Sequence, residues 1–186
     1  MQIEEKRAQL ISIIRERSYG TGVQITLASG RVSDFYFNLK PTMLHPQGAR
    51  LIGDLIVDHL ADRPIDYVGG LEMGAVPVAT AVAAASAETK RPLPAFFIRK
   101  QAKDHGTQGL VEGLVKGTSV EGARVVVLED VTTTGGSAMK AIEILKSEGA
   151  IVECVVTIVD RQEGAAEAFA NARIPFEPVL SRTDFL

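Results

Sequence analysis

The hydrophobic pattern begins with an amphipathic segment and a hairpin. Apolar residues at helical spacing lie among charges in residues 10–14, which predicts a helix ended by the glycines at 20–22. Apolar and small or polar residues alternate in 23–27, which predicts a strand, and 32–37 would be the return strand of a hairpin. A second helix is predicted over 46–60, with a proline in its first turn and an apolar stripe on one face.

From about residue 65 the pattern alternates between short apolar strands and helices. The predicted strands are 65–68, 95–98, 124–128 and 151–159, the helices are 75–88 and 137–148, and glycine-bearing loops are predicted at 69–74 and 99–117. Continuous β-branched runs are typical of parallel strands covered on both faces. The sequence therefore predicts an α/β fold, an open, mostly parallel sheet flanked by helices, beside a small N-terminal α+β segment. In such sheets ligands bind at the carboxyl ends of the strands.

Composition narrows the class of protein. The chain has 186 residues, 46% hydrophobic and 23% charged, which fits one globular domain over 1–186. Twenty Lys+Arg against 23 Asp+Glu give a net charge of −3, which argues against a nucleic-acid binder. The single cysteine, Cys154, excludes a disulfide framework and a Cys-rich zinc site, and its apolar surroundings indicate a buried structural thiol.

The chain also lacks the patterns of a membrane or exported protein. Its N-terminal segment is charged and has no apolar core of a signal peptide. The most apolar stretch, 75–87, is broken by Pro77 and is too short to span a bilayer. We therefore expect a cytoplasmic protein without a membrane partner.

The sharpest chemical signal is a strand that runs into two acids and a turn. Val125–Leu128 is followed by Glu129 and Asp130, and residues 132–137 read Thr-Thr-Thr-Gly-Gly-Ser before a helix. A helix N-terminus with glycines and hydroxyls binds phosphate, and paired acids can accept hydrogen bonds from a ribose diol. The alternative is a plain strand-to-helix turn with Ser137 as the N-cap. The spacing matches neither a P-loop nor a dinucleotide fingerprint.

This stretch resembles the phosphoribosyl pyrophosphate (PRPP) motif of the type I phosphoribosyltransferases. The resemblance implies that Glu129 and Asp130 hold the ribose 2′ and 3′ hydroxyls. It also implies that the following segment binds PRPP around its 5′-phosphate, through Val131, Thr132, Thr133, Thr134, Gly135, Gly136 and Ser137. The implied fold has an N-terminal hood at about 1–40 and a PRPP-binding core at about 60–165.

A basic segment precedes this motif. Residues 99–106 read Arg-Lys-Gln-Ala-Lys-Asp-His-Gly, and such a charge run is often a solvated loop. Beside a phosphate site, however, it could neutralise a pyrophosphate leaving group. The string resembles the flexible catalytic loop of the orotate phosphoribosyltransferases. That resemblance implies pyrophosphate contacts from Arg99, Lys100, Lys103 and His105, with Lys103 as a catalytic residue.

Two further segments resemble the same family. Tyr36 and Phe37 match an aromatic pair of the hood that contacts the pyrimidine, although a hairpin with core aromatics would look alike. Arg161 matches an arginine that contacts orotate, and Thr133 is also expected there; a salt bridge of Arg161 to Asp160 or Glu163 is the alternative.

Two positions depart from the family pattern. Ala28 and Met73 stand where many bacterial members have a lysine that contacts PRPP, which puts those two contacts in doubt.

Taken together, the resemblance implies transfer of a phosphoribosyl group from PRPP to orotate, as in de novo pyrimidine (UMP) biosynthesis. It implies Mg²⁺ held mainly by PRPP, no direct metal ligand from the protein, and a homodimer with shared active sites. His45 and His59 have no neighbours at metal-ligand spacing and are expected to be structural or solvated. The alternatives are a purine phosphoribosyltransferase of the same fold and a PRPP-sensing regulator without catalysis.

Overall fold

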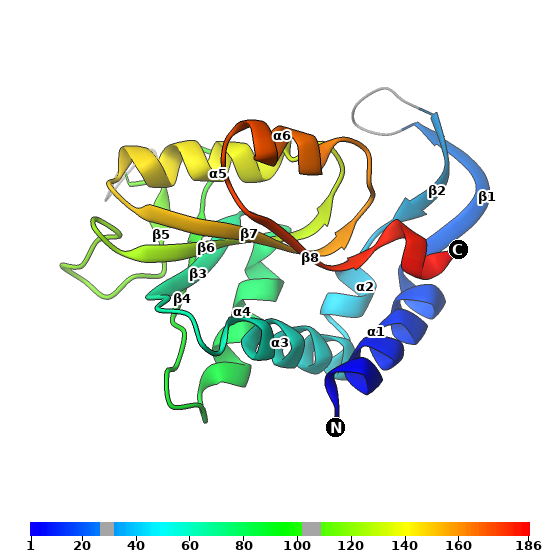
Figure 1. The fold of residues 1–186 in the computed structure, drawn as a ribbon, viewed down its shortest axis with the longest axis horizontal. Coiled ribbons are helices and arrows are strands. Elements are labelled where there is room, and N and C mark those ends of the chain that lie inside the picture. The colour runs from blue at the N-terminus through cyan, green and yellow to red at the C-terminus, as the bar shows by residue number, and fades with distance from the viewer. Residues whose placement is uncertain (27–31, 102–108) are drawn as a thin grey trace.

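The computed structural model describes residues 1–26, 32–101 and 109–186 (Figure 1). The chain begins with α1 (Ile3–Arg17), β1 (Tyr19–Thr26), β2 (Val32–Phe37), α2 (Lys40–Met43) and α3 (Pro46–Leu60). It continues with β3 (Tyr67–Leu71), α4 (Ala75–Ser86), β4 (Ala95–Ile98), β5 (Val111–Glu112) and β6 (Arg124–Thr132). The last elements are α5 (Gly136–Ser147), β7 (Ile151–Asp160), α6 (Ala165–Asn171), β8 (Phe176–Ser181) and the 3₁₀ helix η1 (Arg182–Phe185).

Six strands form one sheet in the order β5-β4-β3-β6-β7-β8. All neighbouring pairs are parallel except β4 with the two-residue β5, so the expected open, mostly parallel α/β sheet is confirmed. After β3 the chain builds outward to β4 on one side, and it later returns to place β6 on the other side. The direction in which successive strands are added therefore reverses between β3 and β6. Ligands of open α/β sheets bind at such a topological switch point.

Helices cover both faces of the sheet (Figure 1). One core joins α1, α3 and α4 to alternate residues of β6 and β7, including Val126, Leu128 and Cys154. The opposite core joins α5 and α6 to the other residues of the same strands, including Val125 and Val127. The burial on both faces explains why these strands consist almost wholly of β-branched and apolar residues. Cys154 is fully buried, as expected.

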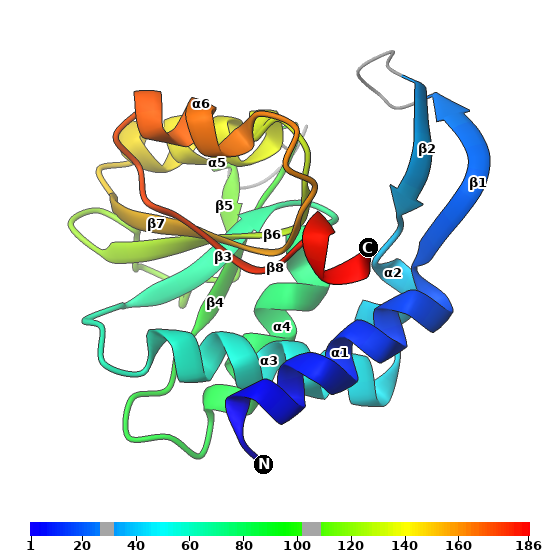
Figure 2. The same cartoon turned by 45° about the vertical axis from the view of Figure 1, so that its right-hand side comes forward.

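The predicted hairpin is confirmed, because β1 and β2 pair antiparallel as a separate sheet. Figure 2 shows the hairpin extending from the end of α1, with η1 beside its base. Three aromatic rings join the hairpin to η1. The Phe37 ring centroid lies 5.0 Å from the centroids of both Tyr19 and Phe185. The C-terminal turn thus packs against the hood through aromatic contacts.

Several boundaries differ from the sequence-based expectations. The first helix ends at Arg17 rather than at the glycines, and β1 begins at Tyr19 rather than at the predicted residue 23, so Gly20 and Gly22 lie in a strand. The strand expected at 65–68 is β3 (Tyr67–Leu71), so Gly69 and Gly70 belong to a strand and not to a loop. The reason is close packing: a Cβ at Gly69 would overlap the carbonyl oxygen of Phe96, and one at Gly70 that of Leu128.

Candidate active site

Four loops meet at the carboxyl edge of the sheet, around the topological switch point between β3 and β6. They follow β3 (72–74), β4 (99–101), β6 (133–135) and β7 (161–164), since parallel strands end at the same edge. The Lys100 backbone N–H donates to the Glu72 carboxylate at 2.9 Å, which joins the first two loops. A Cβ placed on Gly74 would lie 2.5 Å from Oδ1 of Asp130, so that carboxylate lies directly against the 72–74 loop.

The two acids of the motif lie on β6, which continues to Thr132 instead of ending at Leu128. Glu129 accepts a hydrogen bond from the Ala138 backbone N–H in the first turn of α5, while Asp130 faces Gly74 on the other side of the strand. Burial, and then the negative charge of Asp130, raise the pKa of the Glu129 carboxyl to about 8. The pair thus carries less than two full negative charges at neutral pH.

The turn after β6 has the geometry of an anion site. Gly135 has φ of 84°, and a Cβ there would come within 2.9 Å of the Phe169 ring, so only glycine fits this position. α5 begins at Gly136, and Gly135 is its N-cap without any side-chain cap, so Ser137 as the N-cap is wrong. The hydroxyl of Thr132 is buried and has no hydrogen-bond partner among the described residues. Because no side chain caps α5, the backbone N–H groups of its first turn are available as donors to an anion.

Arg161 follows directly after β7, and its side chain is only 4% exposed. Its guanidinium donates to Glu163 through Nε at 2.8 Å, and its second contact with the same oxygen is also 2.8 Å. The Arg161 backbone N–H donates to the Thr132 carbonyl at 2.9 Å, so this arginine is tied to the end of β6. The salt bridge to Glu163 is therefore present, whereas Asp160 accepts from the Gln162 N–H.

The hood residues divide between the two faces of β2. The Tyr36 ring covers Gly20 and is 38% exposed, whereas Phe37 packs into the aromatic contacts with Tyr19 and Phe185. Phe35, which sequence analysis did not select, lies beneath the Arg161 guanidinium at 4.6 Å from the ring centroid. The two-residue spacing of Phe35 and Phe37, which puts both on one face, was the available signal.

The basic segment is described only at its start. Arg99 lies at the end of β4 and pairs with Glu112 of β5 at 3.3 Å, while Lys100 is exposed. Lys103 and His105 lie outside the described residues. Of the other histidines, His59 contacts Glu177 at 2.5 Å, and His45 has a buried Nδ1 without a partner among the described residues.

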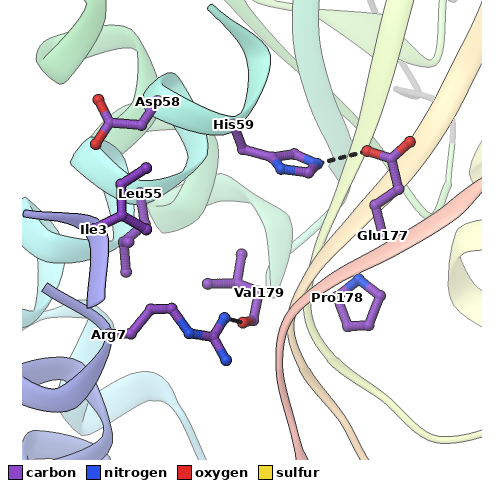
Figure 3. Close-up of a pocket in the computed structure, with 8 residues that line it drawn as sticks. All are labelled: Ile3, Arg7, Leu55, Asp58, His59, Glu177, Pro178 and Val179. Carbon is purple, nitrogen blue, oxygen red and sulfur yellow. Dashed lines mark hydrogen bonds and ion pairs between the residues drawn. The ribbon is translucent and has the colours of Figure 1, made fainter. Parts of the chain in front are cut away.

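Two hollows lie away from this edge. One of about 120 Å³ lies between α1, α3 and β8, and Figure 3 shows His59 pointing at Glu177 across its rim. Another of about 280 Å³ lies near Arg63 and Leu93 at the amino ends of the strands. Within the described ranges, no cluster of three or more His, Cys, Asp or Glu residues could hold a metal ion. No helix in those ranges is long and apolar enough to cross a membrane.

Comparison with known proteins places this geometry in a family. The family model "Phosphoribosyl transferase domain" matches residues 42–179. An orotate phosphoribosyltransferase of Rhodopseudomonas palustris (strain TIE-1) is 56% identical over 186 residues, which cover 100% of this chain and 99% of the relative. A crystal structure of Mycobacterium tuberculosis orotate phosphoribosyltransferase with Fe(III) dicitrate has a TM-score of 0.83 at 42% identity, covering 97% of this chain and 98% of that one.

The same M. tuberculosis enzyme has also been solved in complex with PRPP. That structure has a TM-score of 0.79 at 39% identity, and the match covers 97% of this chain and 98% of that one. Full-length matches at this identity distinguish the chain from purine phosphoribosyltransferases and from PRPP-sensing regulators. The chain belongs to the phosphoribosyl transferase domain family and, within it, to the orotate phosphoribosyltransferases.

Proposed function

We propose that this chain transfers the phosphoribosyl group of PRPP to orotate at the carboxyl edge between β3 and β6. One observation carries the location: the acid pair, the glycine turn that opens α5 and the buried Arg161 all meet at this edge. The ring nitrogen of orotate forms a bond to the anomeric carbon while the bond to pyrophosphate breaks, giving orotidine 5′-monophosphate and pyrophosphate. The protein positions the reactants and stabilises charge, and no covalent nucleophile is required.

The β6–α5 turn is the proposed PRPP site. The 5′-phosphate accepts hydrogen bonds from the backbone at Gly135, Gly136 and Ser137 and from the threonine hydroxyls, at the positive end of α5. Glu129 and Asp130 accept hydrogen bonds from the ribose hydroxyls. The unpartnered, buried hydroxyl of Thr132 supports this assignment, because a bound oxyanion or an ordered water would supply its partner.

The base site is proposed between Arg161 and the hood. A planar, charged guanidinium fits the carboxylate and carbonyl edge of orotate, and its ion pair with Glu163 fixes its orientation. The exposed Tyr36 is available to pack on a planar ring, whereas Phe37 supports the hood from within. Thr133, in the β6–α5 turn, is also proposed to contact orotate.

Mg²⁺ is proposed to arrive with PRPP, bound mainly by pyrophosphate and ribose oxygens. The residues present fit this arrangement, since Asp130 offers a hard oxygen ligand beside the backbone of Gly74. The ion would offset negative charge on the pyrophosphate. Arg99, Lys100, Lys103 and His105 are proposed to contact the same group, with Lys103 as a catalytic residue.

A homodimer with shared sites is also proposed. The test mixes two inactive variants, Lys103→Ala and Asp130→Asn, by unfolding and refolding. If the basic segment serves the partner's site, each mixed dimer has one site with both lesions and one intact site. Random pairing then restores about a quarter of all sites. A mixture no more active than its parents, with mixed dimers confirmed by mass spectrometry, would refute the shared-site proposal.

The function itself is tested by the ultraviolet absorbance of orotate on mixing with PRPP and Mg²⁺. We expect orotate to be consumed only when both are present, with pyrophosphate released in equal amount. Adenine, hypoxanthine and uracil serve as control bases. Consumption of a purine but not of orotate would overturn the proposal.

A further inference from the structure

Phe35 of the hood lies against two guanidinium groups from distant parts of the chain. Arg161 at the end of β7 is 4.6 Å from the ring centroid, and Arg182 in η1 is 4.0 Å from it. Such distances are typical of cation–π contacts. The C-terminal turn thereby places a second positive charge near the proposed base site.

The two arginines differ in how their charge is balanced. Arg161 has Glu163 at 2.8 Å, so a carboxylate already neutralises its guanidinium. Arg182 forms no ion pair among the described residues, and its buried Nε lacks a hydrogen-bond partner there. Burying part of an unbalanced cation is costly, unless a ligand anion or a π-face compensates.

The turn that carries Arg182 is firmly held. Ser181 and Asp184 form a reciprocal capping box, in which the Ser181 N–H donates to Asp184 at 2.7 Å. Arg7 of α1 forms an ion pair with Asp184 at 3.6 Å. The carboxylate nearest to Arg182 in sequence is therefore already paired with another arginine. Phe185 is buried against Tyr19 and Phe37. Arg182 is therefore placed by the fold and is not a freely moving surface side chain.

We propose that Arg182 is a specificity-determining residue for the base: its unbalanced charge favours an anionic, carboxylated pyrimidine over an uncharged one. This inference rests on the proposed function and deepens it. Phe35 holds Arg182 and Arg161 beside one ring, so the carboxylate of the base meets a net positive environment. Arg161 contacts the base edge, but Glu163 offsets its charge, so the additional positive charge comes from Arg182.

The test compares orotate with orotamide, its uncharged amide of nearly the same shape, in the wild type and in Arg182→Gln. At saturating PRPP, orotate is followed by its kcat/KM, and orotamide is followed by its inhibition constant against orotate. Removing one charge that acts across several ångströms of partly buried protein should lower kcat/KM for orotate roughly tenfold in Arg182→Gln. Orotamide binding, the KM for PRPP and the unfolding temperature should change little. Arg182→Lys should retain most of the preference for orotate, and Arg91→Gln, an exposed arginine far from the site, should resemble the wild type.

The outcomes separate the two proposals. A wild-type enzyme that leaves orotate untouched refutes the proposed function. An active wild type with unchanged orotate affinity in Arg182→Gln overturns the inference. Equal losses for orotate and orotamide also overturn it, because they would assign Arg182 a purely structural role in holding Phe35.

Discussion

Replacing Glu129 by glutamine is expected to make the stability of the free protein much less dependent on pH. Burial and the charge of Asp130 raise the folded-state pKa of Glu129 from 4.5 to about 8. Below pH 4.5 the Glu129 carboxyl is protonated in both the folded and the unfolded chain, so it does not lower the free energy of unfolding. Between these two values the unfolded chain releases the proton and the folded chain keeps it, so stability falls as pH rises. Above pH 8 the carboxyl is ionised in both states, and the stability of the folded chain falls no further on account of Glu129.

The size of the effect follows from the width of that window. Each pH unit corresponds to about 1.4 kcal/mol, so the full shift sets an upper bound of about 5 kcal/mol. Relaxation around the ionised carboxylate and entry of water reduce this, and we expect a loss of about 2–3 kcal/mol between pH 5 and pH 8 from this group. Glutamine keeps the shape without the titration.

The assay is urea unfolding of wild type, Glu129→Gln and Glu143→Gln at pH 5, 6, 7 and 8. Glu143 is an exposed glutamate of α5, the helix that follows the motif, and serves as the matched control. We expect the wild type and the control to lose stability together as pH rises, and Glu129→Gln to lose clearly less. A parallel pH dependence for all three proteins would refute the assigned burial of Glu129.

Three further predictions concern the phosphate turn, the basic segment and the buried thiol. Gly136→Val should weaken PRPP binding at least tenfold in calorimetric titration, because a β-branched side chain obstructs the approach of the phosphate to the backbone. Its melting temperature should be unchanged, because a Cβ at Gly136 meets nothing closer than 4.0 Å. Gly135→Val should instead destabilise the fold, because a Cβ at Gly135 meets the Phe169 ring. Lys103→Ala should lower kcat by roughly 10²–10³ with little change in orotate affinity, as expected for a group that stabilises developing charge, and an activity within threefold of wild type contradicts that role. Cys154 should react with a thiol reagent only on unfolding, because burial raises its pKa to about 12; rapid reaction of the native protein would contradict its placement.

The sequence by itself determined the elements whose signals are local. The β-branched runs predicted the central strands β6 and β7 because both faces of each strand are buried. The acid pair, the threonines and the glycines of the β6–α5 turn are contiguous, so their spacing already specified a strand, a turn and a helix N-terminus. The expected hairpin likewise rests on alternation within a few residues.

Tertiary structure decided what depends on neighbours far away in the chain. Gly69 and Gly70 read as a loop, yet close packing against β4 and β6 makes them a strand. Short elements near the C-terminus, β8 and η1, were not predicted because they are stabilised by contacts with β7 and α1 rather than by their own pattern.

The chemistry of the site shows the same division. The sequence identified Glu129 as an acid, but only the packing of α5 and the position of Asp130 raise its pKa. Phe35 and Arg182 are separated by almost the whole chain, and no local pattern could place the guanidinium 4.0 Å from the ring centroid. Charges and rings act through space, so their partners are set by the fold and not by their order along the chain.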